Sequence, residues 1–452
     1  MHYPASELVI DPVLIRKYDL SGPRYTSYPT AERFVEAFGA TQLRQWLAKR
    51  NIGGISQPLS LYVHLPFCEN VRDHGRSAKY IKYLEKELAL AGALAGGGGT
   101  LSELHWGGGT PSFLARDEMG ALMQAIESNF VRGAKADCSI EIDPRSAPPG
   151  TLAFLAGLGF NRVSIGVQDF DAAVQKAVHR VQDEELTRRV VAEARENGFR
   201  SVNFDLICGL PRQTLDSFNR TLDKVLALGP ERIALYSYAH LPKLFKPQRR
   251  IVEADLPSAE SKLQIMTLAI GRLTRAGYRY IGMDHFALPH DALATAQALG
   301  QLKRGFQGYS TQPGDLAGFG VSAIGQIGPT YYQNAKTLDE YYAALDAGRL
   351  PVLRGIELTP DDLVRRAVIQ ALTCQSRVSI ESIELAYLVD FGKYFAGELK
   401  DLRRLADDGL VELEPDWIVV TPKGRLLVRA ICMVFDRYLR ATRERANYSR
   451  VI

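Results

Sequence analysis

The chain has 452 residues, 46% of them hydrophobic and 23% charged, and its formal net charge is only +4. This is the composition of a soluble protein with a large core, long enough for two or three domains, and so weak a charge gives no reason to expect nucleic acid. No stretch approaches the roughly 18 uninterrupted apolar residues of a membrane span, and residues 1–20 lack the pattern of a signal peptide, so we expect a cytoplasmic protein.

Residues 1–55 are predicted to form an extension that precedes the main domain. Within it, the segment LSGPRYTSYPT at 20–30 is dense in Tyr, Ser, Thr and Pro. Such a composition favours an ordered loop over a helix.

From residue 59 onward, predicted strands alternate with predicted helices. Helical spacing of apolar residues is clearest at 79–94 and 183–198, where Gly198 fits a helix C-terminus. This alternation indicates a parallel sheet, and six or seven such units predict an α/β fold with a full or partial (β/α) barrel. An open, doubly wound sheet is the alternative architecture. The predicted strands are LSLYVHL (59–65), LSELHW (101–106), CSIEID (138–143), RVSIGV (162–167), SVNFDLI (201–207), RIALYSYA (232–239) and YRYIGM (278–283).

Polar residues stand at the C-terminal ends of several predicted strands, which is where a barrel carries its chemistry. These residues are His64, Glu141, Gln168, Asp205 and His240. A polar residue at a strand end is also common without any function, so position alone makes each of them a candidate and no more.

After residue 290 the alternation of strands and helices fades. The segment GQLKRGFQGYSTQPGDLAGFGVSAIGQIG at 300–328 is rich in Gly and long for a plain connection, which indicates a functional role. Residues 359–445 are predicted to be mostly helical, and Thr-Pro-Asp at 359–361 fits a helix start. A hairpin predicted at 410–424 completes a pattern that is typical of a winged helix.

A winged helix suggests DNA as an alternative ligand, and the tail carries basic residues in TPKGRLLVRA and RYLRATRERANYSR. Winged helices are, however, often packing modules, and the charge of the whole chain is modest. We therefore expect no nucleic-acid ligand.

The five cysteines, Cys68, Cys138, Cys208, Cys374 and Cys432, are scattered along the chain. An odd number at such spacings does not fit a disulfide framework. The last four are therefore predicted to be reduced thiols in the core.

The motif HWGGGTP at 105–111 follows a predicted strand and precedes a predicted helix. Three glycines allow the backbone to approach a ligand closely, and such a turn can bind a phosphate, a carboxylate or an ammonium group. Its spacing differs from G-x-x-x-x-G-K-[ST], so the phosphate-binding loop of a nucleoside triphosphatase is not expected.

The segment LYVHLPFC at 61–68 leads a predicted strand directly into Cys68. This ending is similar to the start of the cluster motif C-x3-C-x2-C of radical-SAM enzymes, and HWGGGTP is similar to their methionine-binding glycine motif. Over nearly its whole length the chain resembles the oxygen-independent coproporphyrinogen III oxidases. Related heme chaperones usually lack the PRYTSYPT segment, which is the best discriminator. The resemblance is carried further by IEIDPR, SIGVQDF, NFDLICGLP, YAHLP, IGMDHFA, TPKGRLLVR and the terminal YSRVI.

The chain departs from this family immediately after Cys68, where it reads ENVRDHGRSAKYIKYLEKEL. The family pattern needs cysteines where Arg72 and Gly75 stand, while the flanking residues fit the family well, so we expect a short internal deletion. A [4Fe–4S] cluster with one iron free for SAM needs three protein thiolates, and Asp73 and His74 are poor substitutes. We therefore expect no normal cluster and impaired activity. The alternative is a cluster-deficient, non-catalytic protein that binds heme or a porphyrin.

The resemblance implies a partial (β/α)6 TIM-like radical-SAM barrel at 56–295. Residues 1–55 would cap the substrate, and residues 296–358 would connect the domains and line the cavity. A helical, winged-helix-like domain would occupy 359–452.

The resemblance also implies the reaction, which is the anaerobic oxidative decarboxylation of two propionates of coproporphyrinogen III to vinyl groups. The product is protoporphyrinogen IX, an intermediate of heme biosynthesis. The implied cofactors are a [4Fe–4S] cluster and two molecules of S-adenosylmethionine (SAM), with flavodoxin or ferredoxin as the reducing electron donor. A monomer is expected.

The resemblance implies two sets of SAM contacts, and Cys68 as the remaining metal ligand. Glu141 can accept from the SAM ammonium, Asp205 from ribose hydroxyls, and Arg180 can pair with a carboxylate. Asp205 and Arg180 could instead form a strand-end salt bridge. The first SAM would contact Tyr62, Gly108, Glu141 and Ile324. The second would contact Gly109, Thr110, Gln168, Arg180, Asp205 and Ala239.

Substrate contacts are predicted less specifically, and no catalytic residue is assigned. Arg24 and Tyr25 in the N-terminal segment could approach the propionates, although Tyr often simply packs. Gln307 and Tyr309 could line the substrate cavity.

Overall fold

A twelve-stranded sheet organises the chain, with strand order β14-β13-β12-β11-β1-β2-β3-β4-β5-β6-β8-β7. This computed structural model describes residues 8–18, 22–50, 58–67, 74–95, 100–243, 245–312 and 314–441. Strands β1 to β6 pair in parallel, each with the next. They are β1 (Leu59–Leu65), β2 (Thr100–Gly108), β3 (Val131–Ile142), β4 (Arg162–Gln168), β5 (Ser201–Cys208) and β6 (Arg232–Ser237).

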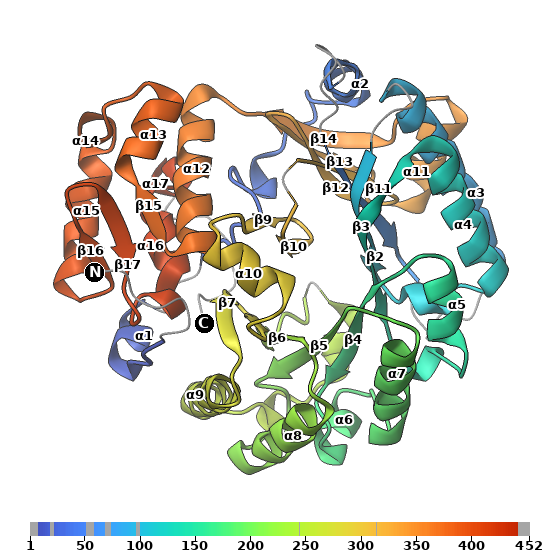
Figure 1. Ribbon diagram of the computed structural model, residues 1–452, viewed down its shortest axis with the longest axis horizontal. Coiled ribbons are helices and arrows are strands. Elements are labelled where there is room, and N and C mark those ends of the chain that lie inside the picture. The colour runs from blue at the N-terminus through green and yellow to red at the C-terminus, as the bar shows by residue number, and fades with distance from the viewer. Residues whose placement is uncertain are drawn as a thin grey trace.

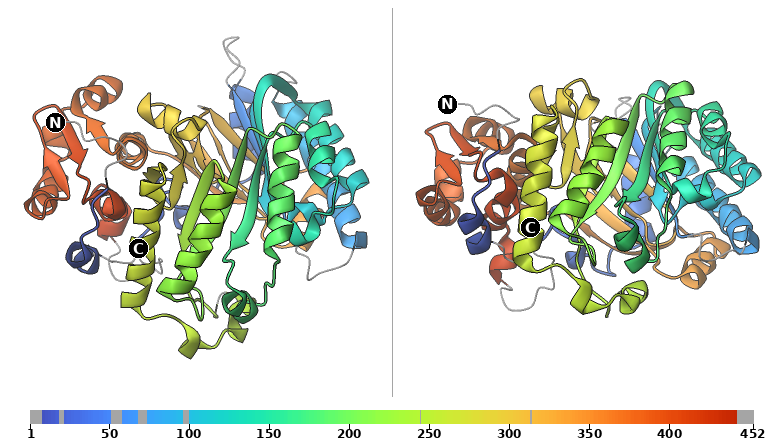
Figure 2. Two further views of the ribbon diagram at one scale, coloured as in Figure 1. Left: turned by 60° about the horizontal axis from the view of Figure 1, so that its bottom comes forward. Right: turned by 90° about the horizontal axis from the view of Figure 1, so that it is seen from below.

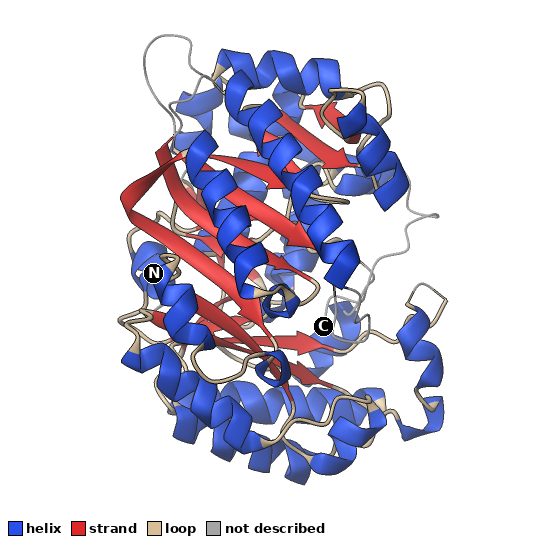
Figure 3. Cartoon of the chain, turned by 90° about the vertical axis from the view of Figure 1, so that its right-hand side faces the viewer, coloured by secondary structure: helices blue, strands red, loops and turns tan. Residues whose placement is uncertain are grey.

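Helices connect these strands and cover the outer face of the sheet (Figure 1; Figure 3, helices blue and strands red). Since β14 (Val352–Glu357) and β7 (Arg279–Gly282) end the strand order, the barrel is partial, and the prediction of a (β/α) barrel over a doubly wound sheet is confirmed. The helices are α3 (His74–Leu94), α4 (Arg116–Asn129), α5 (Thr151–Gly157), α6 (Ala172–Ala177), α7 (Glu184–Glu196), α8 (Leu215–Leu228), α9 (Ala259–Arg275) and α10 (Ala292–Ala298).

The strands divide apolar from polar side chains because successive residues point to opposite faces. On the outer face, Ile140, Ile165 and Phe204 are fully buried under the helices. Each such side chain stabilises the fold by about 1.5–3 kcal/mol. On the inner face of β3 and β5 lie half-buried polar residues, including Glu141 and Asp205. The lumen of the barrel is therefore polar, and its outer layer is the hydrophobic core.

Local signals set the helix ends, as at α7. Asp183 caps this helix by accepting from the N–H of Glu185 at 3.1 Å. Gly198 follows its end with a left-handed φ of 76°. The helix predicted at 183–198 is confirmed, and so is most of α3.

The strand predicted at 278–283 is present, but the prediction that it continues the parallel barrel is wrong. It forms β7, which turns at Met283 and pairs antiparallel with β8 (His285–Ala287), and β8 in turn pairs antiparallel with β6. Because only a short turn separates β7 from β8, there is no room for the helical crossover that parallel pairing of these two strands would require.

Residues 300–334 supply further strands, which the sequence pattern did not indicate. A hairpin of β9 (Lys303–Gly305) and β10 (Gly308–Ser310) comes first. Strand β11 (Asp315–Phe319) then pairs in parallel with β1. The antiparallel strands β12 (Ile324–Ile327), β13 (Thr330–Asn334) and β14 extend this edge, and α11 (Leu338–Asp346) precedes β14.

The C-terminal region forms a separate, mainly helical core beside a three-stranded antiparallel sheet. The hairpin predicted at 410–424 is confirmed as β16 (Val411–Leu413) and β17 (Trp417–Val420), joined by β15 (Arg377–Ser379). The helices are α12 (Pro360–Gln375), α13 (Ile380–Tyr387), α14 (Phe391–Tyr394), α15 (Ala396–Asp407), α16 (Val428–Val434) and α17 (Arg437–Ala441).

The N-terminal residues contact both parts of the molecule. Helix α1 (Pro12–Tyr18) lies against the C-terminal domain, where Lys17 pairs with Asp408 at 2.5 Å (Figures 1 and 2). Tyr25 and Tyr28 belong to the core of that domain. Helix α2 (Ala40–Lys49) packs at the opposite edge, on β12 and β14. The extension therefore ties the C-terminal domain to the far edge of the sheet.

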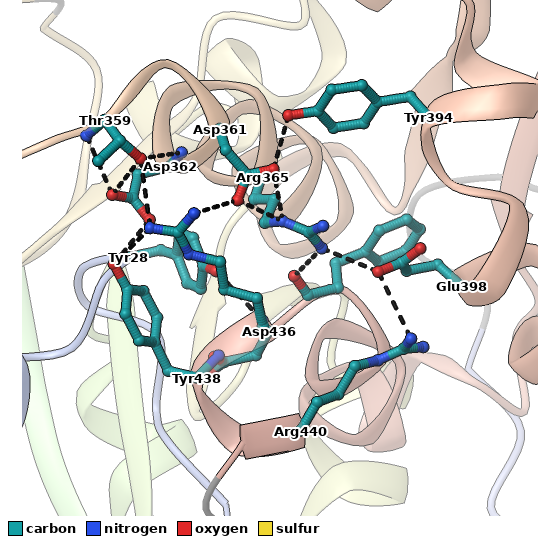
Figure 4. A network of polar contacts seen from close by, with 12 residues as sticks. Tyr28, Thr359, Asp361, Asp362, Arg365, Tyr394, Glu398, Asp436, Tyr438 and Arg440 are labelled. Carbon is teal, nitrogen blue, oxygen red and sulfur yellow. Dashed lines mark hydrogen bonds and ion pairs between the residues drawn. The ribbon is translucent and has the colours of Figure 1, made fainter.

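An ion-pair network connects the helices of the C-terminal domain (Figure 4). Arg365 donates to Asp361 at 2.9 Å and to Glu398 at 3.0 Å, and Arg437 pairs with Asp361 at 2.7 Å. Arg365 and Glu398 are only 11% and 8% exposed, so both charges need the oppositely charged partners that this network supplies.

Candidate active site

The inner faces of the strands enclose a cavity of about 160 Å³, which we call the lumen cavity. Its walls are polar because the alternate residues of each strand that point into the barrel are polar. The residues that line it include Glu103, His105, Glu141, Asp205, Tyr236 and His285.

The glycine turn at the end of β2 packs directly on the end of β1. The N–H of Gly109 donates to the carbonyl of Leu65 at 2.8 Å, and that of Thr110 donates to the carbonyl of Phe67 at 2.6 Å. Gly108 has a φ of 110°, and a Cβ atom there would lie 2.4 Å from the ring of His64. The glycines are thus required for packing as well as for a ligand, and they place the turn beside the strand that precedes Cys68.

Glu141 faces this turn from the adjacent strand β3. Its Oε2 accepts from the N–H of Gly108 at 3.1 Å, and its Oε1 lies 3.3 Å from His105 Nε2. Burial raises the pKa of this carboxyl, but the hydrogen bonds from His105 and Gly108 outweigh that effect and hold the pKa below its ordinary value. Glu141 is therefore a carboxylate at neutral pH and can accept from an ammonium group beside the turn.

Tyr62 completes this first group. Its hydroxyl lies 3.0 Å from His64 Nδ1, and its ring stacks on His105 with centroids 5.8 Å apart. Burial lowers the pKa of His64, so its ring is neutral at physiological pH. The structure thus brings together three residues of the first predicted SAM set, Tyr62, Gly108 and Glu141.

Asp205 lies two strands farther along the lumen, on β5. It accepts from Ser164 Oγ at 2.9 Å and from Asn203 Nδ2 at 3.0 Å. Burial, with a contribution from the charge of Glu141, raises the pKa of Asp205 to about 7. The carboxyl is therefore half-protonated near neutral pH. A hydrogen bond donated by a ligand hydroxyl would stabilise its charged form.

Gln168 and Arg180 lie together at the end of β4. Gln168 has a left-handed φ of 64°. Arg180 donates to the carbonyl of Gly166 at 3.0 Å and pairs with Asp143 at 3.0 Å, which helps to hold the pKa of that buried carboxyl below its ordinary value. The salt bridge that the sequence left open as an alternative role for Arg180 is present.

The remaining predicted cofactor contacts lie toward the two ends of the sheet. Ala239 follows β6, and its carbonyl accepts from Gln248 Nε2 at 3.1 Å. Ile324 begins β12, two strands from β1 on the opposite side. Cys68 and the residues that follow it, to Asp73, lie outside the described residues.

The two predicted substrate residues, Arg24 and Tyr25, occupy different environments. Arg24 pairs with Asp284 at 3.3 Å and lies 5.9 Å from the ring of Tyr236, beside the lumen cavity. Tyr25 is only 4% exposed, and its hydroxyl donates to Asp436 at 3.1 Å. Arg24 is therefore near the lumen, whereas Tyr25 joins the extension to the C-terminal domain.

Sequence reasoning missed several lumen residues. Glu103 accepts from Gln307 at 2.6 Å and from Ser310 at 3.0 Å, which attaches the β9–β10 hairpin to the barrel. His285 is buried, and burial lowers its pKa to about 3. The alternation of polar residues along each strand could have identified Glu103, but His285 reaches the lumen only through an antiparallel hairpin.

The cysteines beyond Cys68 lie away from the lumen. Cys138 and Cys208 sit on the buried outer faces of β3 and β5, and Cys374 and Cys432 are buried in α12 and α16. Burial raises the pKa of Cys208 to about 12 and that of Cys374 to about 11. The expectation of reduced core thiols is confirmed for these four. Within the described ranges, no group of three or more His, Cys, Asp or Glu residues is arranged to hold a metal ion.

Two family models match the chain. One describes the radical SAM superfamily and covers residues 66–225, and the other describes the HemN C-terminal domain and covers residues 358–427. Among the described residues, no helix has the length and apolar character needed to cross a membrane.

Relatives match over almost the full length. An oxygen-independent coproporphyrinogen III oxidase of Pseudomonas aeruginosa is 50% identical over 456 positions, which cover 98% of each chain, and one of Escherichia coli is 48% identical over 98% of each. The alignment of 456 positions is longer than this chain of 452 residues, so the Pseudomonas protein holds residues that this chain lacks.

A solved structure agrees with the fold. Coproporphyrinogen III oxidase (HemN) of E. coli, described as a radical SAM enzyme, superposes with a TM-score of 0.91 at 46% identity. The match covers 96% of this chain and 100% of the other.

Proposed function

The chain belongs to the family of oxygen-independent coproporphyrinogen III oxidases, and from this membership we propose how its residues serve the family's reaction. That reaction is the oxidative decarboxylation of two propionates of coproporphyrinogen III to vinyl groups, which yields protoporphyrinogen IX in heme biosynthesis. The chain is an oxidoreductase of the radical SAM type. Relatives of this kind support the enzymatic function and give no support to the alternative of a non-catalytic porphyrin binder.

The residues around the glycine turn fit SAM. When bound, SAM supplies the 5′-deoxyadenosyl group with which this family abstracts hydrogen from the propionate. We assign the SAM ammonium to the carboxylate of Glu141, which is charged and faces the turn at Gly108. Tyr62, whose ring stacks on His105, would contact the same SAM molecule, and so would Ile324 at the start of β12.

A second SAM molecule is proposed along the ends of β4, β5 and β6. Asp205 would accept from ribose hydroxyls, and Arg180 would hold a carboxylate from its position on Asp143. The remaining proposed contacts are Gly109, Thr110, Gln168 and Ala239.

The thiols of this chain do not fit a cluster held by three cysteine thiolates. Cys68 is the only cysteine before residue 138, and the other four are buried in the outer core of the barrel and in the C-terminal domain. Thiols whose pKa is raised by burial are not metal ligands without rearrangement. We propose that this exact chain catalyses the reaction only once the missing thiolates are supplied.

Domain roles and partners are proposed on the same basis. Residues 1–55 would cap the substrate, residues 56–295 would form the catalytic barrel, and residues 296–358 would line the cavity and supply β11. Residues 359–452 would pack as the winged-helix-like domain. We also propose a cytoplasmic monomer that receives electrons from flavodoxin or ferredoxin.

The convergence of Glu141, Gly108 and Tyr62 carries the proposed SAM assignment, and SAM binding tests it without any cluster. In equilibrium dialysis, Glu141→Gln should weaken SAM binding by a factor of about 10 or more, since a hydrogen bond to a charged group contributes about 1.5–3 kcal/mol. Glu381→Gln, at an exposed position on α13, is the control and should bind SAM like the parent. Equal SAM binding by Glu141→Gln and the parent would reject the assignment.

A further inference from the structure

A second cavity, of about 520 Å³, adjoins the lumen cavity, and we call it the base cavity. The two share Glu103, Gln307 and Ser310 as lining residues. It lies at the starts of the strands, since Ser60 and Asp315, near the beginnings of β1 and β11, also line it. Its other wall is α12, whose Gln370 donates to the carbonyl of Arg304 at 2.7 Å. In Figure 1, β9 and β10 lie beside α12.

Three cationic residues line this base cavity, namely Lys303, Arg304 and Arg366. Arg304 is only 6% exposed. Within the described part of the chain, its Nε and Nη1 have no hydrogen-bond partner, and the same holds for Nη1 of Arg366. The Arg304 guanidinium lies 4.8 Å from the centroid of the Tyr309 ring, a cation–π contact that leaves these N–H groups without an acceptor.

The acidic residues of the cavity do not neutralise these arginines. Asp315 is paired with Arg50 at 2.5 Å and also accepts from the N–H of Gly328 at 2.8 Å. Glu103 is held by hydrogen bonds from Gln307 at 2.6 Å and Ser310 at 3.0 Å, and burial raises the pKa of its carboxyl, so it offsets at most one of the three cationic charges. The base cavity therefore has a surplus of positive charge.

Unpaired N–H groups on a buried guanidinium cost free energy that a matching anion would recover. A carboxylate is a suitable anion, because its two oxygens can accept two parallel hydrogen bonds from one guanidinium group. The substrate of the proposed function carries propionate carboxylates at its rim.

The cavity also lies at a suitable distance from the glycine turn. Glu103 and Gly108 are five residues apart on β2, which corresponds to about 17 Å along a strand. A tetrapyrrole with extended propionates is of this order in length. One edge of the ring can thus face the turn while another reaches the base cavity.

We propose that the base cavity binds propionate carboxylates of the tetrapyrrole, with Arg304 and Arg366 as the residues that hold them. This inference rests on the proposed function, because it takes the substrate class from it. It assigns substrate-positioning residues that lie on the far side of the lumen from the SAM contacts.

Titration with coproporphyrin III, the stable oxidised form of the substrate, tests the proposal without any cluster. Binding would be followed by the change in porphyrin absorbance and fluorescence. Arg304→Gln and Arg366→Gln should each raise the Kd about 10-fold, as expected for the loss of a charged hydrogen-bonding group. The matched control is Arg188→Gln, an exposed arginine on the outer helix α7, which should bind like the parent.

The tetramethyl ester of coproporphyrin III provides the second arm, because it lacks the carboxylates. The parent and both variants should bind the ester with equal affinity. Should Arg304→Gln fail to fold, judged by circular dichroism, Arg366→Gln and Arg304→Lys still decide the question. Unchanged coproporphyrin affinity in the folded variants would overturn the inference while leaving the function intact, whereas no binding by the parent would instead count against the proposed function.

Discussion

Glu87 is a buried carboxyl whose titration should make the stability of the barrel depend on pH. It lies on α3, is 2% exposed, and accepts from Gly320 N–H at 2.8 Å, Asn334 Nδ2 at 2.6 Å and Tyr341 Oη at 2.6 Å. Burial raises its pKa from 4.5 to about 7, although these three hydrogen bonds act in the opposite direction. The group therefore holds its proton more tightly in the folded chain than in the unfolded chain.

The direction of the pH effect follows from this difference. Because the pKa of Glu87 is higher in the folded state, its stabilising contribution is complete below pH 4.5 and is lost as the pH rises through about 7. The difference between these values corresponds to about 3 kcal/mol. Replacement by Gln removes the titration. Between pH 5 and 8, Glu87→Gln should therefore lose about 2–3 kcal/mol less unfolding free energy than the parent.

Urea unfolding at a series of pH values measures this effect, with Glu85→Gln on the same helix as the matched control. The control should keep the pH dependence of the parent, because Glu85 is more exposed than Glu87. If Glu87→Gln loses stability between pH 5 and 8 as steeply as the parent, the assignment of this pH dependence to Glu87 is refuted.

Three further predictions concern the glycine turn, the C-terminal network and the cluster. Gly109→Ala would place a Cβ 2.3 Å from the carbonyl of Phe67 and should cost about 1–3 kcal/mol in urea unfolding; an unchanged midpoint would contradict the packing described. Arg365→Leu removes the cation nearest to the buried Glu398 and leaves it only Arg440 at 3.6 Å, so it should destabilise the C-terminal domain by about 3 kcal/mol, seen as a lower Tm; a Tm equal to that of the parent would argue against the network. Anaerobic reconstitution of the chain as it stands should give well under the four irons of a [4Fe–4S] cluster; about four irons with a SAM-sensitive EPR signal would contradict this expectation.

The features that could be predicted from the sequence are those carried by local periodicity. The residue pattern located the strands around Glu141 and Asp205, and Gly198 located the end of a helix. The hairpin at 410–424 was also predicted from its own segment of sequence. Local rules suffice for these elements because each element's own residues decide its form.

The features that escaped prediction depend on pairing between distant residues. Strand β11 is short, and its place beside β1 is set by contacts across more than 200 positions of sequence. The hairpin that turns His285 into the lumen depends likewise on β6. Tyr25 illustrates the same limit at the level of the site, since its partner Asp436 belongs to the C-terminal domain.

Anaerobic turnover by a repaired chain tests the assigned function most directly. A segment that completes the C-x3-C-x2-C motif beginning at Cys68 would be inserted between Val71 and Arg72. The protein would then be reconstituted and incubated with SAM, a reductant and coproporphyrinogen III. We expect protoporphyrinogen IX and 5′-deoxyadenosine from the repaired chain and neither from the unrepaired one. A repaired chain that holds its full iron complement and binds SAM, yet forms no protoporphyrinogen IX, would contradict the function assigned to this barrel.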